Sequence, residues 1–567
     1  MKTPASTDPC VNNAIPLVSD LPALRSNSGT TATPAVPAEV SKPKRGLYFW
    51  LVMLAICVSV FLSALEYTSV STALPTIVHD LDGEDFVWVP SAYVLAATAL
   101  LPATGAVAEV FGRRLSMIAV LALFALGSAL CGAAQNMNWL IAARAVQGAG
   151  GGGILSVTGI IVADLVPLRQ RAPFIALLGL TWAMACAIGP SVGGALAKEG
   201  QWRWLFYLNL PVNGVAAVLT VCFLRVKTPH GSFIDKMKRL DWVGNFMIIA
   251  SSSACVIGLT WGGVKFPWSS AHVLCPLIIG IVGIVLFLVY EALVAREPLV
   301  PFSLVSNRTS LSGYLQTFLA PVVVVALICK FSFHYLPIYY QACKLASPLH
   351  AGVELLAICL VIAPVIIISG VSITKTKAYR PQLYLGWAFL MAAMGAMSTL
   401  KADTGTSASV GIPSLAGVGA GFLYQATYYP VLAPLPVSKN AHALALFSFC
   451  RVFAGVWGVT IGTAVLQTQL TKRLPAEFLE AFPQGVAIAY SVIPTIPSLE
   501  EPLRTQVRIA FADSIAVVWR VLLGIAGMGF LASLAMKSFP LHTQVDEQWG
   551  LEGDVASRDS DKHEPEA

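Results

Sequence analysis

Two ionisable side chains lie inside long apolar runs of this sequence, where a charge is unfavourable unless it is paired or hydrated. Glu66 is the one acid in the run 49–74, and Arg144 lies in the run 139–164. An arginine at the centre of a membrane helix costs roughly 2.5–3.5 kcal/mol on insertion scales, so it must face a bundle interior or water. A buried carboxyl group such as that of Glu66 can hold and release a proton. For Arg144, a side chain extending to the membrane surface from near the helix end is the alternative.

Charges of both signs gather in the short segment between the second and third apolar runs. Glu109 stands one turn before Arg113 and Arg114, and Gly105 and Gly112 lie on either side of it. Glycine allows a tight turn between two helices. The pattern favours a charged latch between two helix bundles. A basic turn that only sets membrane topology would contain the same residues, so this alternative remains.

Small residues recur at helical spacing in the uncharged apolar run 173–196. Gly189 and Gly193 are one helical turn apart, as are Pro190 and Gly194. Such residues form a smooth face on which another helix can lie close. Proline is tolerated in a membrane helix because neighbouring groups satisfy the freed backbone atoms. The spacing therefore predicts a tight packing face.

Polar and aromatic residues in other apolar runs are candidates for lining a substrate cavity. Lys330 and His334 are four residues apart, so they share one face of a helix. A polar pair near a helix end is the alternative. Tyr424 and Gln425 belong to an aromatic and polar surface that suits amphipathic ligands, although interfacial packing explains it equally well. The remaining cavity candidates are Gln147 and Trp182.

The composition indicates that these residues belong to a membrane protein. Of the 567 residues, 56% are hydrophobic and 12% are charged, whereas a soluble domain carries about 25% charged residues. We therefore predict an all-α polytopic protein whose spans contain roughly 20 apolar residues each. Fourteen spans are expected, at residues 49–74, 88–108, 115–135, 139–164, 173–196, 203–224, 241–262, 272–294, 312–340, 351–373, 381–400, 408–434, 443–468 and 514–537.

The spans divide the chain into five expected parts. These are a disordered N-terminal tail (1–45), a six-helix bundle (46–230), two additional linker helices (231–300), a second six-helix bundle with a long outer loop at 469–513 (301–537), and an acidic C-terminal tail (538–567).

The distribution of lysine and arginine predicts the orientation. With the N-terminus inside, 19 of these residues fall in inner segments and 5 in short outer loops, so both termini are expected in the cytoplasm. Asn307 belongs to the only N-x-S/T sequence, which lies in an expected inner loop. No glycan is therefore expected on it.

Several segments match patterns that occur together in one family. Residues 65–77 resemble the helix-1 signature L-D-x-T-x-V-x-x-A-L-P-x-I, with glutamate at Glu66 in place of aspartate. Residues 105–114 are similar to G-x-L-x-D-x-x-G-R-R/K, again with glutamate for aspartate, and residues 144–148 look like R-x-x-Q-G. Residues 179–194 resemble G-(x)n-G-P-x-x-G-G, and Trp202 to Pro211 resemble W-R-W-x-F-x-x-N-x-P. In this order the segments resemble the fourteen-span drug:proton antiporters of the major facilitator superfamily.

The resemblance implies a fold and roles for these residues. The fold would consist of two six-helix bundles with two extra central helices. Glu66 and Arg144 would take part in proton coupling, and residues 105–114 would form the conformational latch. The antiporter motif, which closes the pathway on one side and suppresses leak, would comprise Gly179, Gly189, Pro190, Gly193 and Gly194.

The function implied is export of drugs, toxins or secondary metabolites in exchange for protons. Proton-coupled uptake, for example of an iron chelate, is one alternative, and a transport-dead membrane sensor or scaffold is another. An enzyme is not expected, because no nucleophile, metal cluster or acid pair gathers in a soluble part. The sequence has no G-x-x-x-x-G-K-S/T loop, so the proton gradient rather than ATP is the expected energy source.

Partners and location follow from the same reasoning. The expected partners are a small-molecule substrate, protons and the lipid bilayer, without nucleic acid, and the chain is expected to act as a monomer. No cofactor or metal is expected, since most cysteines lie in apolar runs without metal-site spacing. The tails resemble those of fungal members. The plasma membrane is the first expected location and the vacuolar membrane the second.

Overall fold

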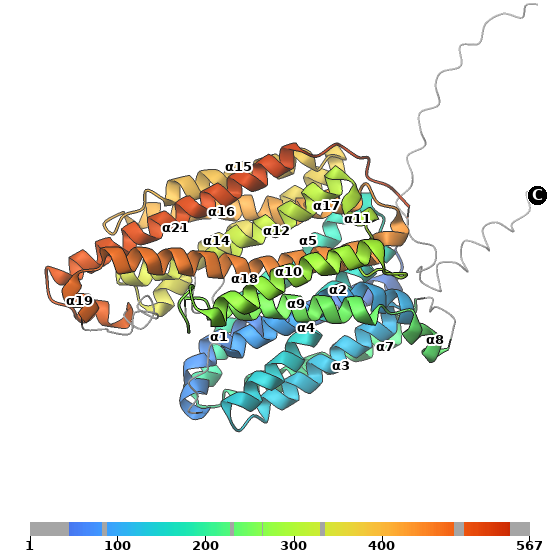
Figure 1. Cartoon of the computed structure of the whole chain (residues 1–567), viewed down its shortest axis with the longest axis horizontal. Helices are drawn as coiled ribbons and strands as arrows, with labels where there is room; N and C mark the ends of the chain where they lie inside the picture. Colours follow the sequence, from blue (N-terminus) through green and yellow to red (C-terminus); the bar gives the residue numbers. More distant parts are fainter. Residues whose placement is uncertain are drawn as a thin grey trace, which may run out of the picture. The chain divides into compact units, whose positions relative to one another are not determined.

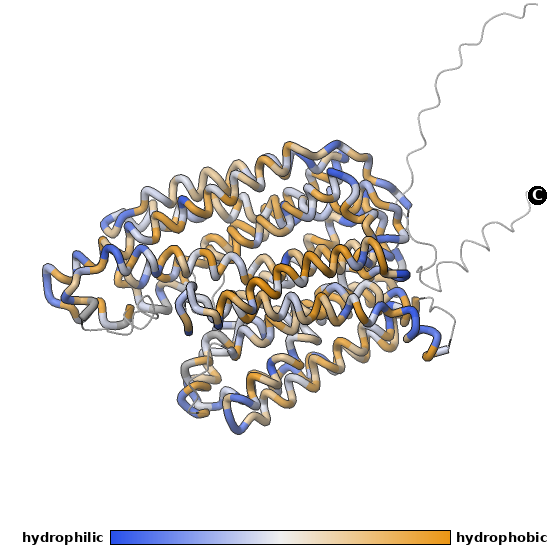
Figure 2. Tube along the Cα trace, viewed as in Figure 1, coloured by the Kyte–Doolittle hydropathy of each residue, from blue (hydrophilic) through white to orange (hydrophobic). Residues whose placement is uncertain are grey.

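Helices account for the architecture of this protein. The structure is a computed structural model in which residues 45–81, 88–226, 232–263, 265–328, 335–480 and 493–544 are described. Thirteen membrane-span candidates occur among them. The remaining predicted span coincides with α15 (Arg380–Met397), whose polar first turn lowers its hydropathy. Hydrophobic residues follow the helix lengths and hydrophilic residues gather at the ends (Figure 2). The prediction of an all-α membrane fold with fourteen spans is confirmed.

Six spans form the N-terminal half. Helix α1 packs against α5 and α7, and α4 packs against α2 and α3. The sixth span is made of two consecutive helices, α6 and α7. The elements are α1 (Leu47–Leu81), α2 (Trp88–Phe111), α3 (Arg113–Gly132), α4 (Met137–Leu165), η1 (Leu168–Gln170), α5 (Ala172–Lys198), α6 (Arg203–Tyr207) and α7 (Asn209–Phe223).

Two further spans follow, preceded by the short helix α8 (Phe233–Lys238). They are α9 (Trp242–Trp261) and α10 (Ala271–Leu293), which pack against each other. Helix α9 also contacts α2 and α18, and Figure 1 shows the pair beside these helices. Much of α10 is apolar and exposed, as in Ile279 and Val285. Such a surface is expected to face lipid rather than water.

The C-terminal half contains the last six spans. Here α12 packs against α18 and α21, and α16 packs against α14 and α15. The elements are α11 (Ser303–Ser306), α12 (Arg308–Ile328), α13 (Tyr335–Ile338), η2 (Tyr339–Cys343), α14 (Pro348–Thr376), α15, α16 (Thr406–Ala426), α17 (Tyr428–Leu432), η3 (Val437–Lys439), α18 (Asn440–Arg473), α19 (Ala476–Glu480), η4 (Ile493–Ser498) and α21 (Leu503–Leu534).

Local sequence signals explain several helix ends. The Asn136 side chain accepts a hydrogen bond of 2.8 Å from the Trp139 backbone N–H and so caps α4. Asp241 caps α9 in the same way, through the backbone N–H of Gly244 at 2.9 Å. Gly112 adopts φ 88° between α2 and α3, a left-handed conformation that favours glycine. The tight turn predicted there depends on this residue.

The N- and C-terminal halves meet where α4 lies against α18 and along two more extensive helix pairs. Helix α5 packs against α14, and α2 packs against α18. We call the end of the helices that holds the α2–α3 turn, the α4–α5 turn and residues 537–544 the basic end. It carries Arg113, Arg169 and Arg171. The opposite end holds the α3–α4 and α15–α16 turns.

The structure differs from the predicted boundaries in the C-terminal half. Of the span predicted at 312–340, the structure describes α12 as far as Ile328 and α13 from Tyr335, and residues 329–334 lie outside the described residues. The loop predicted at 469–513 is shorter, since α18 continues to Arg473 and α21 begins at Leu503. Val507 and Phe511 are buried, so packing extends α21 beyond the apolar run that the sequence indicates.

Candidate functional site

Glu66 and Arg144 form an ion pair in the interior of the N-terminal half. Arg144 Nη1 lies 2.6 Å from Glu66 Oε1, and neither side chain has any exposed surface. The pair joins α1 to α4, at positions 78 residues apart in the chain. Both charges are removed from solvent, so loss of either partner would leave the other uncompensated, at a cost of about 3–5 kcal/mol. The structure therefore places both groups in the setting that the sequence predicts for paired charges.

Hydrogen bonds that involve two further helices, α3 and α7, surround this pair. Asn209 of α7 donates from Nδ2 to Glu66 Oε2. Arg144 Nη1 also donates to Gln147 Oε1 at 2.5 Å, and Gln147 Nε2 donates to Ser128 Oγ of α3 at 2.8 Å. Gln147 is fully buried. Both ends of its amide are used within the N-terminal half, and its role as a cavity residue stays a prediction.

The α2 helix supports the arginine from the remaining side. Arg144 Nε donates to the Val89 carbonyl oxygen at 3.2 Å. Its guanidinium carbon lies 4.5 Å from the centroid of the Tyr93 ring, within the range of a cation–π contact. Arg144 Nη2 is buried without a hydrogen-bond partner. The cation thus keeps one unused donor at the centre of the site.

Glycines in α4 allow these helices to approach. A Cβ at Gly148 would overlap the Tyr93 backbone, and one at Gly150 would overlap the Phe124 backbone. The run of glycines after Arg144 therefore lets α4 lie directly against both α2 and α3. This close packing brings Arg144 into the interior, where it meets Glu66, rather than to the membrane surface.

A second charged contact crosses between the two halves at the basic end. Glu109 Oε1 of α2 lies 3.2 Å from His442 Nδ1 of α18. The contact is an ion pair when the imidazole is protonated. A Cβ at Gly105 would lie 2.9 Å from the Ala441 carbonyl oxygen, so α2 and α18 approach closely here. Glu109 and Gly105 therefore lie at the interface where the sequence predicts a latch.

The arginines of the same segment bind partners within the N-terminal half. Arg113 Nε donates to Asp164 Oδ2 of α4 at 2.7 Å, and both side chains are buried. Arg114 Nη2 donates to the Val221 carbonyl oxygen of α7 at 2.6 Å. Partners for both arginines therefore come from α4 and α7, and their part in the latch stays a prediction.

Helix α5 uses its predicted small residues on two different faces. A Cβ at Gly189 or Gly193 would overlap Thr68 or Ser69 of α1. Gly179 faces the other half, since a Cβ there would lie 3.3 Å from the Tyr424 ring. Gly194 has open space around it, so its predicted place in the packing face is wrong. The helix continues through Pro190 without interruption.

Further hydrogen bonds join the halves at the basic end. Arg171 Nη1 lies 3.5 Å from the Tyr428 hydroxyl, and Gln425 Nε2 donates to the Ala172 carbonyl oxygen at 3.2 Å. The C-terminal segment adds a contact, because the Arg169 backbone N–H donates to the His542 carbonyl oxygen at 3.4 Å. Gln425, predicted to line a cavity, is buried in this closed interface.

His542 lies close to the charged residue Arg171 at the basic end. Burial lowers the pKa of His542, and the nearby Arg171 guanidinium lowers it further. Neither ring nitrogen has a hydrogen-bond partner. The neutral imidazole is therefore the form that suits this position, and protonation would place a second cation beside Arg171.

The other predicted cavity residues lie in different surroundings, and two of them lie outside the described residues. The Trp182 ring of α5 lies 6.2 Å from the Tyr67 ring of α1, measured between centroids. The Tyr424 ring stacks with Arg451, a residue that the sequence reasoning left without a role. Lys330 and His334 lie outside the described residues.

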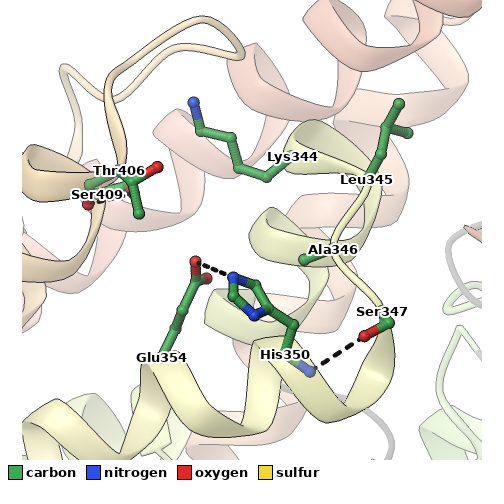
Figure 3. A pocket seen from close by; sticks show the side chains of 8 residues that line it. All are labelled: Lys344, Leu345, Ala346, Ser347, His350, Glu354, Thr406 and Ser409. Atoms are coloured by element: carbon green, nitrogen blue, oxygen red, sulfur yellow. Dashed lines mark hydrogen bonds and ion pairs between the residues drawn. The ribbon is translucent and has the colours of Figure 1, made fainter.

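A pocket of about 500 Å³ opens at the opposite end of the C-terminal half. Glu354 of α14 faces it and lies 3.5 Å from His350 Nε2 through its Oε1 atom. Figure 3 shows the Glu354 carboxylate directed toward the side that holds Lys344 and Thr406. Burial lowers the pKa of Lys344. The sequence reasoning did not identify this pocket, because its walls come from the starts of two helices separated in the chain.

Comparison with known proteins identifies the family. A model described as the Major Facilitator Superfamily matches residues 56–459. The chain belongs to the Major Facilitator Superfamily. Within it, the chain is 36% identical to the MFS-type efflux pump LUC4 of a Fusarium species, over 94% of this chain and 95% of that protein. It is 38% identical to the efflux pump FUS6 of Gibberella fujikuroi, over 90% of this chain and 92% of the relative.

Solved structures share the fold of this Major Facilitator Superfamily chain. The human organic anion transporter MFSD10 (TETRAN) superimposes with a TM-score of 0.53 at 14% identity, over 85% of this chain and 100% of that chain. At this identity the similarity shows the fold alone. Together with the curated relatives, it identifies a multi-pass membrane transporter rather than an enzyme, and the predicted family resemblance is confirmed.

Proposed function

We propose that this chain exports small organic molecules in exchange for protons. The observation that carries the proposal is the Glu66–Arg144 ion pair, which is fully buried within the N-terminal half. Ionisable residues inside the membrane-spanning part of a protein are rare and mark functional sites. Export rather than uptake is supported by the efflux-pump names of the relatives.

The pair offers a physical route to coupling. Desolvation favours the neutral form of a carboxyl group, whereas a nearby cation favours its ionised form. A conformational change that alters the distance to Arg144, or the access of water, therefore changes the proton affinity of Glu66. Proton binding on one side of the membrane and release on the other can then move substrate the opposite way.

The contacts between halves support an alternating mechanism. Polar contacts join the halves at the basic end, through Glu109, Arg171 and Gln425. We propose that the basic end faces the cytoplasm, as the charge distribution indicates. The structure then corresponds to a state closed to the cytoplasm. Return to the inward-facing state requires these contacts to break.

The biological setting is proposed from the same relatives. We propose that the substrates are drugs, toxins or fungal secondary metabolites, and that the chain acts as a monomer in the plasma membrane, with the vacuolar membrane as second choice. Both termini would lie in the cytoplasm.

Transport in vesicles tests the function as a whole. The full chain is reconstituted into liposomes, a panel of aromatic and terpenoid compounds is offered, and a pH gradient is imposed in either direction. We expect at least one compound to be concentrated against its gradient only when protons flow the opposite way. Accumulation that follows the proton flow would favour uptake, and no response to the gradient would contradict proton coupling.

A further inference from the structure

Arg451 is a charged residue in the interior of α18 that the ion pairs described above do not involve. It lies within the span that starts at Val437 and ends at Arg473, and its side chain is half-buried. No described residue forms an ion pair or hydrogen bond with its guanidinium group. Arg113 and Arg144, in contrast, each bind a buried carboxylate. An unpaired cation in a membrane span is unfavourable unless it has a functional partner.

Aromatic rings hold the guanidinium group in place. Its central carbon lies 3.9 Å from the centroid of the Tyr424 ring of α16 and 5.9 Å from that of Phe447, one turn earlier in α18. Both distances are within the range of a cation–π contact, which uses none of the N–H groups as a hydrogen-bond donor to a described residue. The N–H donors point outward from the edge of the guanidinium group, in a geometry that matches a carboxylate. The guanidinium group therefore lies against aromatic rings while its N–H donors remain available for a ligand.

The position of Tyr424 links this group to the interface between the halves. Tyr424 contacts α5 at Gly179, where no side chain intervenes. Phe447 packs edge-on against Tyr428, with 5.7 Å between the ring centroids, and Tyr428 contacts Arg171 across the same interface. The cation thus contacts the aromatic rings of Tyr424 and Phe447 at the junction of α5, α16 and α18.

We propose that Arg451 is the binding group for the carboxylate of an exported organic acid, whose aromatic or apolar body packs against Tyr424 and Phe447. This substrate class rests on the proposed export function. A carboxylate would supply the missing counter-charge and accept two hydrogen bonds from the edge of the guanidinium group. Organic cations are disfavoured at the same position by charge repulsion.

Binding of a matched pair of probes tests the proposal. The full chain in lipid nanodiscs is titrated with naphthalene-2-carboxylate and with the neutral naphthalene-2-carboxamide at neutral pH. The two probes have nearly the same shape, so their difference reports the charge. We expect the carboxylate to bind the unaltered chain at least about tenfold more tightly, as a charge-assisted hydrogen bond predicts. Equal affinities, or no binding of the carboxylate, would overturn the proposal without the need for any variant.

Substitutions assign the effect to this residue. We expect Arg451→Gln to weaken carboxylate binding about tenfold while leaving carboxamide binding unchanged, and Arg451→Lys to retain part of the preference. Arg520→Gln is the control, because Arg520 is an exposed arginine of α21. Loss of binding of both probes by Arg451→Gln would indicate misfolding. In that case the carboxylate preference of Arg451→Lys, compared with that of the unaltered chain, decides whether the effect belongs to this residue. An unchanged preference in a folded Arg451→Gln variant would overturn the assignment.

The binding test can fail or succeed independently of the transport test of the proposed function. Glu66→Gln should keep the carboxylate preference, since Glu66 lies in the N-terminal half and Arg451 in the C-terminal half. Preference for the carboxylate without gradient-driven transport would retain the Arg451 site and contradict proton-coupled export. Gradient-driven transport without that preference would support proton-coupled export and contradict the Arg451 site.

Discussion

Glu109 of α2 and His442 of α18 approach to 3.2 Å across the interface between the two halves of the transporter. The contact requires α2 and α18 to be close, as they are while the basic end is closed. It therefore lowers the free energy of the closed state relative to that of a state open at this end. We expect Glu109→Gln to shift the population toward a state open at the basic end, by about 1–3 kcal/mol, since the two side chains are only 10% and 28% exposed. Labelling of single cysteines should increase at the basic end and decrease at the opposite end.

A double-mutant cycle provides the control for this contact. His442→Gln should cause a shift in the same direction, and the double variant should add little to either change. Identical labelling in all variants and the unaltered chain would show that the contact does not influence the equilibrium.

Gly193 and Gly194 offer a matched pair of substitutions in α5. A Cβ at Gly193 would overlap the Ser69 carbonyl oxygen of α1, whereas Gly194 has nothing within 4 Å. Gly193→Leu should insert into the membrane but lose transport or leak, because overpacking displaces α5 from α1 at a cost of about 1–3 kcal/mol or more. Gly194→Leu should transport normally. Efflux from vesicles, with size-exclusion chromatography to assess folding, measures both, and wild-type efflux by Gly193→Leu would contradict this packing.

The glycosylation state of Asn307 tests the orientation. Asn307 precedes α12, and Thr309 at its start accepts a hydrogen bond of 3.0 Å from the Lys537 backbone N–H. The site therefore lies at the basic end, which we place in the cytoplasm. We expect no shift in mass on glycosidase treatment of the protein from a eukaryotic host. A shift that Asn307→Gln removes would invert the proposed orientation.

The C-terminal segment should respond to pH through His542. The pKa of His542 is lowered by burial, so the released segment binds protons more readily than the packed one. The packed segment is therefore fully stable above the ordinary imidazole pKa of about 6.5, and weakens as the pH falls below it. A spin label introduced by Gln544→Cys should become more mobile in that acidic range. His542→Gln should remove the pH dependence, and an unchanged response in that variant would assign it to another group.

Much of this site can be predicted from the sequence, because charges inside apolar runs are so costly. Glu66 and Arg144 stand out individually for this reason. Their contact could not be read from the sequence, since it depends on tertiary packing, in which the glycines that follow Arg144 bring α4 against α2 and α3.

The residues that were missed lie near helix ends or have no charged neighbour in the chain. His442 and Asp164 are polar residues near helix ends, where polar residues are common. Only tertiary packing brings them to Glu109 and Arg113. The start of α21 was placed too late, because its first turns mix polar and apolar residues and are stabilised by packing. Local hydropathy carries no information about such contacts.

Gradient-driven efflux by Glu66 variants tests the central claim most directly. Glu66→Gln fixes the neutral form and leaves Arg144 without its counter-charge, so accumulation against the substrate gradient should be abolished. Gradient-independent exchange of substrate serves as the control for folding and binding, and should survive. Glu66→Asp should retain part of the coupled transport, because it keeps the carboxylate. Accumulation by Glu66→Gln at the wild-type rate under the same pH gradient would contradict the account.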